Sequence, residues 1–464
     1  MLKIYNTLTK KIDEFKPISD KEVGLYTCGP TVYHYAHIGN LRTYIFEDIL
    51  KRVLEYNGYE INHVMNITDV GHLTDDGDNG EDKMEKGSQR EGKTAWEIAE
   101  FYTQAFQKNL KELNIESPTT WCKATDNIPE QIAFVQTLTD KGFTYATSDG
   151  IYFDTTKFPS YGEMANLQNQ ELEAGSRVDM GEKKNPHDFA LWKFSKPEEK
   201  RQMEWEAFGR KGFPGWHIEC SAMSSKYLGH HFDIHCGGID HIPVHHTNEI
   251  AQSEAAFGEH PWVNYWMHGE FIVMKNDEKM SKSGDNFVIL DTLIAKNIDP
   301  LAYRFFLLQT HYRKQLNFSW KALEAAQTGL NNLRNKVLAL KNKNIKTLKH
   351  ENTSPDVLVI KTSFLEKIND DLDMPGALAS IFDALKNDEI DYETILQFDK
   401  ILGLELDKIK KENIEIPDDV QKLLDERKKA REEKNWSESD RLRDEIKALG
   451  YNVEDTSEGQ QISK

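Results

Sequence analysis

The sequence is poor in cysteine. Among 464 residues there are four cysteines, at the widely separated positions Cys28, Cys122, Cys220 and Cys236. So few thiols, so far apart, do not make the disulfide framework that holds small secreted proteins together. Each cysteine is therefore expected to be either a small buried apolar residue, which is the commoner case, or a metal ligand or nucleophile.

Long apolar runs are missing as well. No stretch approaches the roughly 20 apolar residues that a membrane helix needs. The first residues, MLKIYNTLTKK, contain neither an apolar signal core nor a small-residue cleavage site. We therefore expect a cytoplasmic protein that makes no contact with membranes.

Basic residues are fewer than acidic ones, 58 against 77, which gives a formal net charge of −19. This excess of negative charge argues against a nucleic-acid partner and favours small-molecule chemistry. One region reverses it: residues 325–349 contain no acid but hold Arg334, Lys336, Lys341, Lys343, Lys346 and Lys349. This region is either a surface for RNA phosphates or a solvated lysine-rich face, and charge alone favours the second.

The first part of the chain has an α/β pattern. Residues 22–32 read as a strand and a turn, residues 38–54 carry apolar side chains at helical spacing, and residues 61–69 form a second strand-like run. Strand, helix and strand within about fifty residues predict a βαβ unit and hence a parallel sheet.

The rest of the sequence changes character twice. Residues 115–212 hold short strand-like pieces and polar turns, which favour an insertion, and α/β patterns resume at residues 230–240. After about residue 317 the pattern is amphipathic and helical. A Lys- and Glu-rich stretch at residues 410–417 has the composition of a linker, and a small unit of charged helices follows it.

Two short motifs suit phosphate chemistry. HIGN (His37 to Asn40) follows a strand and turn where a helix begins, and a helix N-terminus attracts phosphate. Gly39 allows a nucleotide to approach the backbone closely. In KMSKS, Lys279 and Lys282 would neutralise charge that builds up on pyrophosphate. Each motif alone has a simpler explanation, a helix cap for the first and a surface loop for the second.

Together the motifs carry a resemblance. HIGN followed about 240 residues later by KMSKS resembles the signature of class I aminoacyl-tRNA synthetases. The wider set CGPTVYHYAHIGN, NITDVGHLTDD, GFPGWHIECSAM, DIHCGGID, HHTNE, WMHGEFIVMKNDEKMSKS and DDLDMPGAL resembles the cysteinyl-tRNA synthetase family, from Tyr5 to about Asp455.

The resemblance implies an α/β fold: a Rossmann-like parallel-sheet catalytic core with an insertion, followed by an α-helical bundle and a small C-terminal anticodon-binding domain. The implied domains are a catalytic core in two halves, a connective insertion, a KMSKS-bearing linking domain, a helical bundle that contacts the tRNA stem, and the anticodon-binding domain. Their expected ranges are, in that order, 1–114 with 213–265, 115–212, 266–317, 318–412 and 413–464.

The resemblance also implies one zinc ion per chain, bound by Cys28, Cys220, His245 and Glu249. If VHHTNE is helical, His245 and Glu249 lie one turn apart on the same face. Spacing alone does not decide whether His245 or His246 is the ligand, whereas the family pattern selects His245. Two thiolates, an imidazole and a carboxylate are a set that zinc accepts. Such a zinc would bind the sulfur of the amino acid cysteine and reject serine.

Further roles follow from the same match. The implied cysteine pocket consists of Gly29, Thr68, Trp216 and His235. The implied catalytic residues are His37, Asn40, Lys279 and Lys282, and those that bind ATP are His37, Gly39, Asn40, Gly238, Asp240 and Lys282. Mg²⁺ is expected with the nucleotide.

The implied reaction joins L-cysteine to tRNA(Cys) through cysteinyl-adenylate, with ATP as the third partner, and the family tends to be monomeric. The basic region at residues 334–349 would follow the tRNA backbone. Candidates for anticodon contacts are Arg427, Lys428, Lys429, Arg431, Trp436, Arg441 and Arg443, although ion pairs with neighbouring acids on the helix are the expected role of most of them.

Three departures from the family pattern stand out: Gly284-Asp285 after KMSKS, Asn40 in place of the second histidine of the general class I motif, and Ile462 where tryptophan is common.

Two alternatives compete with tRNA charging. A cysteine ligase acting on an aminosugar would lack the roughly 150 residues that follow the core. A non-catalytic tRNA-binding relative would not need intact motifs and all four zinc candidates.

Overall fold

The computed structural model describes residues 1–72, 82–167, 182–196, 201–274, 287–346, 355–409, 417–456 and 459–463. The chain forms two compact units, Met1–Asp407 and Lys408–Lys464, and each is described by itself. The KMSKS segment, with Lys279 and Lys282, and the Gly284-Asp285 pair lie outside the described residues, so what the sequence predicts for them stays a prediction.

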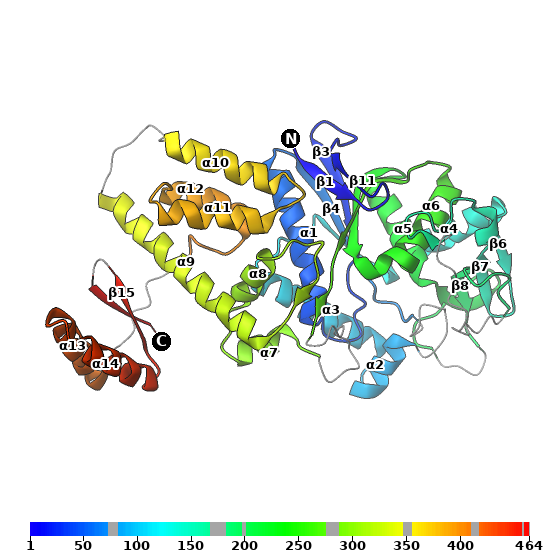
Figure 1. Ribbon diagram of the computed structural model, residues 1–464. Coiled ribbons are helices and arrows are strands. Elements are labelled where there is room, and N and C mark those ends of the chain that lie inside the picture. Colours follow the sequence, from blue (N-terminus) through cyan, green and yellow to red (C-terminus); the bar gives the residue numbers. More distant parts are fainter. Residues whose placement is uncertain are drawn as a thin grey trace. The chain divides into compact units, whose positions relative to one another are not determined.

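A parallel sheet forms the centre of the first unit (Figure 1). Among the described residues it has five strands in the order β12-β11-β3-β4-β5, all paired in parallel. Their bounds are Val263–Gly269, Phe232–Gly238, Glu22–Thr27, Glu60–Ile67 and Thr120–Lys123. The predicted Rossmann-like core is therefore confirmed. Because β4 lies on one side of β3 and β11 on the other, the strand order reverses at β3, and ligands bind at such a point beyond the carboxyl ends of the strands.

One boundary of the core needs correction. The sequence placed residues 115–212 in the insertion, but β5 pairs with β4 at the edge of the central sheet. The strand consists of four residues, TWCK, of which only Cys122 is buried. So short an edge strand shows no clear alternation of apolar and polar residues, which explains why its pattern was not recognised.

Helix α1 (Ile38–Tyr56) connects β3 to β4 and completes the predicted βαβ unit. Its apolar residues Ile38, Leu41, Ile45 and Ile49 recur at helical spacing and are buried. His37 is the N-cap: its Nδ1 accepts the N–H of Asn40 at 3.0 Å, and Asn40 Oδ1 accepts the N–H of His37 at 3.2 Å. This reciprocal pair is a capping box and fixes where the helix begins.

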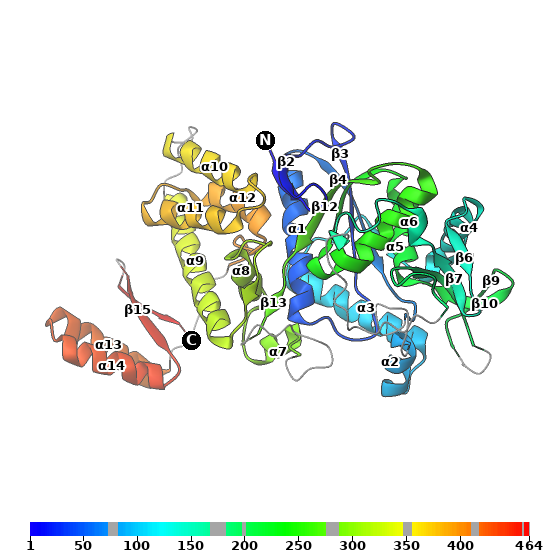
Figure 2. The same cartoon turned by 45° about the vertical axis from the view of Figure 1, so that its right-hand side comes forward.

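A second, antiparallel sheet follows β5 in the chain. Its order is β6-β7-β8-β10-β9, with bounds Thr144–Ala146, Gly150–Phe153, Phe189–Phe194, Arg210–Pro214 and Trp205–Ala207. Figures 1 and 2 show this sheet beyond helices α5 (Trp216–Leu228) and α6 (Thr247–Phe257), which separate it from the central sheet. The chain returns from β10 directly into α5, which carries several predicted site residues.

Shorter elements complete the α/β part of the first unit. Strands β1 (Lys3–Asn6) and β2 (Lys11–Glu14) form an antiparallel hairpin, and β13 (Ile272–Val273) pairs in parallel with β14 (Leu316–Asn317). Helices α2, α3, α4, α7 and α8 span Lys83–Glu91, Ala95–Glu112, Ile128–Asp140, Leu290–Ala295 and Pro300–Leu308. Helix α8 packs against α1 and leads toward the helical region.

The predicted helical region is present. Helices α9 to α12 gather on the α1 side of the sheet (Figure 2), with bounds Trp320–Lys346, Pro355–Ile368, Met374–Lys386 and Tyr392–Leu402. Helix α11 starts as the sequence predicts, with Asp373 as N-cap and Pro375 in the first turn. Within the described residues, no helix is both long and apolar enough to cross a membrane.

The second unit consists of α13 (Asp418–Glu432), α14 (Trp436–Ala448) and an antiparallel hairpin of β15 (Asn452–Thr456) and β16 (Gly459–Ser463). Its core consists of Val420, Leu424, Ile446, Tyr451 and Val453. Ile462, one of the departures from the family pattern, pairs with Val453 and packs against this core. At this position the chain therefore uses an aliphatic residue for packing.

Glu47 is an unusual residue on the buried face of α1. It is 1% exposed, and within the described part of the chain neither carboxyl oxygen has a hydrogen-bond partner. Burial raises the pKa of Glu47 well above its usual range. The folded state therefore favours the protonated form of Glu47. The contribution of this carboxyl to stability is present at low pH and is lost as pH rises above the pKa that Glu47 has in the unfolded chain.

We expect Glu47→Gln to stabilise the protein increasingly as pH rises. Glutamine keeps the shape and polarity but cannot ionise, so the variant should gain about 1–3 kcal/mol in free energy of unfolding at pH 8 and little at pH 4.5. Urea denaturation of both proteins at several pH values measures this difference. A gain that is the same at pH 4.5 and pH 8 would contradict the assignment.

Candidate active site

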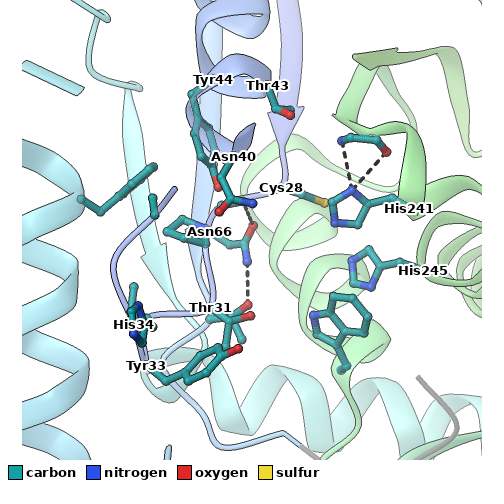
Figure 3. Close-up of a pocket in the computed structure, with 18 of the residues that line it drawn as sticks. Cys28, Thr31, Tyr33, His34, Asn40, Thr43, Tyr44, Asn66, His241 and His245 are labelled. Carbon is teal, nitrogen blue, oxygen red and sulfur yellow. Dashed lines mark hydrogen bonds between the residues drawn. The ribbon is translucent and has the colours of Figure 1, made fainter. Parts of the chain in front are cut away.

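A cavity of about 220 Å³ opens at the carboxyl ends of β3, β4 and β11 (Figure 3). The predicted site residues that line it are Cys28, Gly29, Asn40, Thr68, Trp216, Cys220, Gly238, Asp240 and His245. They come from the loop after β3, the first turn of α1, the end of β4, α5 and the segment after β11. Figure 3 shows Cys28, His241 and His245 on one side of the cavity, and Tyr33 and His34 on the other.

The four predicted zinc ligands lie together. Cys28, Cys220, His245 and Glu249 are buried, and each offers one ligand atom within 4.8 Å of the others. The Sγ atoms of Cys28 and Cys220 are 4.0 Å apart, and His245 Nε2 is 2.9 Å from Glu249 Oε1. Two thiols, one imidazole and one carboxylate at these separations fit a single zinc ion.

The backbone explains how His245 and Glu249 meet. Residues Ile242–His246 form one turn of π-helix directly before α6. The wider turn feeds into α6, and His245 and Glu249 still face the same side, as the sequence predicts. Such π turns occur frequently at functional sites.

The same cluster is electrostatically paired. Burial alone would lower the pKa of His245, but the Glu249 carboxylate and the Cys220 thiol raise it to about 10. Burial would raise the pKa of Glu249, whereas His235 and His245 hold it at about 2. A hydrogen bond from Cys28 lowers the pKa of Cys220, while burial raises the pKa of Cys28. The Glu249 carboxylate is thus in the form that binds metal, while zinc binding would displace a proton from His245 and from each thiol.

Several histidines surround the ligand cluster. His217 Nδ1 lies 3.0 Å from His245 Nδ1, so the ring of His245 is held with Nε2 toward Glu249. A partner on the second ring nitrogen is usual for a histidine that binds metal. Sequence reasoning missed His217, although its place three residues before Cys220 in one helix was a usable signal.

His235 lies next to the ligand cluster. It is fully buried, and its Nε2 lies 2.9 Å from Glu249 Oε2. With Cys28, Glu249 and His246 it forms a second group whose ligand atoms are also within 4.8 Å. The structure places His235 beside the ligand cluster, and its role in the cysteine pocket stays a prediction.

Gly29 and Trp216 shape the cavity. The N–H of Gly29 donates to Asn66 Oδ1 at 2.8 Å, and a Cβ at residue 29 would lie 1.6 Å from the carbonyl oxygen of Asn66. Only glycine allows the loop after β3 to approach the end of β4 this closely. The ring of Trp216 lies 4.4 Å from that of His245, and Lys83 Nζ is 5.3 Å from the Trp216 ring.

The HIGN segment has a structural role that the sequence left open. His37 caps α1 through Nδ1, and the N–H of Ile38 donates to Val288 O at 2.8 Å. His37 is 8% exposed, and Asn40 lines the cavity. The cap orients the first turn of α1, so that Asn40 faces the cavity at the positive end of the helix.

Two solved structures share this fold. The chain superposes on a Mycobacterium tuberculosis methionyl-tRNA synthetase in complex with methionyl-adenylate with a TM-score of 0.58, at 16% identity, covering 83% of this chain and 88% of that one. The LeuRS of an Agrobacterium radiobacter K84 complex gives a TM-score of 0.59 at 11% identity, covering 84% of each chain. At such identities the likeness shows the fold alone.

Residues 14–328 match the model of the family described as tRNA synthetases class I (C) catalytic domain, and residues 414–462 match the Cysteinyl-tRNA ligase anticodon binding domain. The chain is therefore a class I aminoacyl-tRNA synthetase. It is 50% identical to Cysteine--tRNA ligase 1 of Burkholderia lata, over 99% of this chain and 96% of that protein. It is also 46% identical to Cysteine--tRNA ligase of Treponema denticola, over 98% of both. The chain belongs to the cysteine--tRNA ligase family, and the second unit contains its anticodon-binding domain.

Proposed function

We propose that this protein ligates L-cysteine to tRNA(Cys) at the expense of ATP. The observation that carries the proposal is the gathering of Cys28, Cys220, His245 and Glu249 beside a cavity that Asn40 of HIGN also lines. A thiol-selective group thus lies next to the start of a helix suited to phosphate. Family membership supports the same reaction.

Zinc is the metal that this donor set favours. When bound, it would supply a soft cation that holds a thiolate more readily than the hydroxyl of serine. Gly29, Thr68 and Trp216 are proposed to enclose the rest of the amino acid, and Thr68 and Trp216 lie on opposite elements, the end of β4 and the start of α5. Binding of this kind fixes the substrate carboxylate in one position.

The first chemical step joins cysteine to ATP. The cysteine carboxylate oxygen attacks the α-phosphorus, a new P–O bond forms, and pyrophosphate leaves with the electrons of the broken bond. His37, Gly39 and Asn40 at the start of α1 are proposed to bind the phosphates, and Mg²⁺ would accompany the nucleotide. Lys279 and Lys282 are proposed to neutralise the leaving pyrophosphate.

Gly238 and Asp240 are proposed to bind the adenosine. Both line the cavity beyond the end of β11, where the Asp240 carboxylate would accept hydrogen bonds from the ribose hydroxyls. In the second step, the 2′-hydroxyl oxygen of the terminal adenosine of tRNA attacks the adenylate carbonyl carbon. The bond from this carbon to the phosphate oxygen breaks, AMP leaves, and the hydroxyl proton is released to water.

The anticodon contact is proposed for one face of the second unit. Trp436 is 57% exposed and the Arg431 guanidinium lies 5.6 Å from its ring, an arrangement that suits an unstacked base. Arg427 is 1% exposed and binds both oxygens of Asp455 at 2.9 Å, so it supports the fold of the unit and leaves the group of anticodon candidates. Arg441 pairs with Glu438 and Glu445 on its own helix.

A stem contact along α9 is also proposed, through its exposed bases. Arg334 and Lys343 are ion-paired with Asp299 and Asp388, which leaves the exposed Lys336 as the stronger candidate on this helix. That the protein acts as a monomer in the cytoplasm is a prediction that rests on its family.

Exchange of labelled pyrophosphate into ATP tests the proposal directly. We expect exchange that depends on cysteine and not on serine, and transfer of labelled cysteine to a tRNA(Cys) transcript but not to an aminosugar. Transfer to the aminosugar would favour the alternative ligase. No exchange with zinc-loaded protein would favour a non-catalytic RNA-binding role.

A further inference from the structure

A chain of hydrogen bonds crosses the floor of the cavity. The N–H of Gly29 donates to Asn66 Oδ1 at 2.8 Å, and Asn66 Nδ2 donates to Thr68 Oγ1 at 3.1 Å; Figure 3 shows Asn66 between these two bonds. The Thr68 hydroxyl in turn donates to Glu219 Oε2 at 2.9 Å. The other oxygen of Glu219 lies 2.6 Å from His72 Nε2. The chain thus links the ends of β3 and β4 with the first turn of α5.

The direction of each bond is fixed by chemistry. A backbone N–H only donates, so the oxygen of the Asn66 amide faces Gly29 and its NH₂ group faces Thr68. An ionised carboxylate only accepts, so the single hydroxyl proton of Thr68 points to Glu219. One lone pair of Thr68 Oγ1 accepts from Asn66. What remains for a ligand in the cavity is one lone pair, which accepts a hydrogen bond and cannot donate one.

Charge reinforces this polarity. Glu219 is fully buried directly behind Thr68, in the first turn of α5. A cation, Lys83, lines the same cavity and lies over the ring of Trp216. A zwitterionic amino acid therefore finds a negative region near Thr68 and a positive one near Trp216.

We propose that Glu219 is a positioning residue that, together with Asn66, sets the proton of the Thr68 hydroxyl so that the pocket accepts the α-ammonium group of cysteine. This inference rests on the proposed function, because it takes cysteine as the occupant. Glu219 does not touch the substrate. It acts through Thr68, whose remaining lone pair receives an ammonium N–H.

Two thiols that differ in one group test the inference. Cysteamine has the thiol and ammonium of cysteine without the carboxylate, and 3-mercaptopropionate has the thiol and carboxylate without the ammonium. Both are measured as competitive inhibitors of cysteine-dependent pyrophosphate exchange. For Glu219→Gln we expect about 10- to 100-fold weaker inhibition by cysteamine and a similar rise in the KM for cysteine, since a charge-assisted interaction is lost. Inhibition by 3-mercaptopropionate should change less than about 3-fold.

Matched variants separate positioning from general damage. Thr68→Val should reproduce the effect of Glu219→Gln, Thr68→Ser should retain the parent pattern, and the double variant Glu219→Gln with Thr68→Val should be no worse than Thr68→Val alone. Zinc content should equal that of the parent, although Glu219 adjoins Cys220 in sequence.

Equal weakening of both inhibitors, additive losses in the double variant, or loss of zinc would overturn the inference. The proposed function fails separately, if the parent protein itself shows no exchange that depends on cysteine.

Discussion

Cys220→Ser should remove both the bound zinc and the ability to activate cysteine. The substitution keeps the size of the side chain and replaces a thiolate ligand by a hydroxyl that binds zinc weakly. We expect about one zinc per chain in the parent protein, less than about 0.1 in the variant, and a fall in cysteine-dependent pyrophosphate exchange of about 10³-fold or more. Atomic emission of the purified proteins and the exchange assay measure the two effects.

Cys122→Ser is the matched control. Cys122 and Cys220 are each 2% exposed and belong to the same apolar core, but Cys122 lies outside the ligand cluster and its thiol donates to Met65 O. The control should keep its zinc and most of its exchange activity. If both variants lost zinc alike, the loss would reflect core damage, and if Cys220→Ser kept its zinc, the proposed ligand set would be wrong.

The zinc ligands illustrate what sequence could predict. Cys28, Cys220 and the pair His245 and Glu249 are far apart in the chain, and the family pattern singled them out. The parallel sheet explains why they converge, since the loops after β3 and β11 meet at one edge beside α5. The βαβ pattern and the motif HIGN were strong local signals for this part of the fold.

The hydrogen-bond chain beside this cluster had no such signal. Asn66 and Thr68 are two residues apart, in β4 and directly after it, but Glu219 is 151 residues from Thr68. Hydrogen bonds between residues so far apart in the sequence produce no periodic pattern in it. They become visible only when the strand end and the helix are placed against each other.

For a related reason, the charge pattern did not predict the contacts of Arg427 in the second unit. Arg427 lies in a highly charged helix and is one of the candidates for anticodon contact, yet it is buried against Asp455 of the β15–β16 hairpin. Whether a charged residue is paired across elements depends on tertiary packing. Sequence spacing reports only the pairs within one helix, such as Arg441 with Glu445.

A second large effect is expected at Arg304, a fully buried arginine in α8. Its Nη2 lies 2.5 Å from Asp48 Oδ2 of α1, and its Nε donates to Leu402 O at 2.6 Å. Its Nη1 donates to Leu113 O at 3.1 Å. One guanidinium therefore connects α1, the end of α12 and the turn after α3. Removing it would leave the carbonyl oxygens of Leu402 and Leu113 without this donor, and Asp48 with Arg52 as its remaining ion-pair partner.

We expect Arg304→Met to lower the free energy of unfolding by about 3–5 kcal/mol, the range typical of breaking a buried ion pair. Tryptophan fluorescence in urea follows this unit, because every tryptophan except Trp436 lies within Met1–Asp407. Arg304 and Arg52 lower the pKa of Asp48, although burial raises it. The contribution of this carboxylate is present above the pKa of the unfolded chain and lost in acid, so the difference should be constant between pH 5 and pH 8.

Arg334→Met provides the comparison within the same unit. Arg334 Nη1 is 2.6 Å from Asp299 Oδ2, a geometry close to that of Arg304, but the side chains are 21% and 31% exposed. Solvent compensates the loss of such a pair, and we expect a cost below about 1 kcal/mol. Equal losses of unfolding free energy in the two variants would show that burial does not determine the contribution of Arg304 to stability. The connection between α1, α8 and α12 would then depend on apolar packing instead.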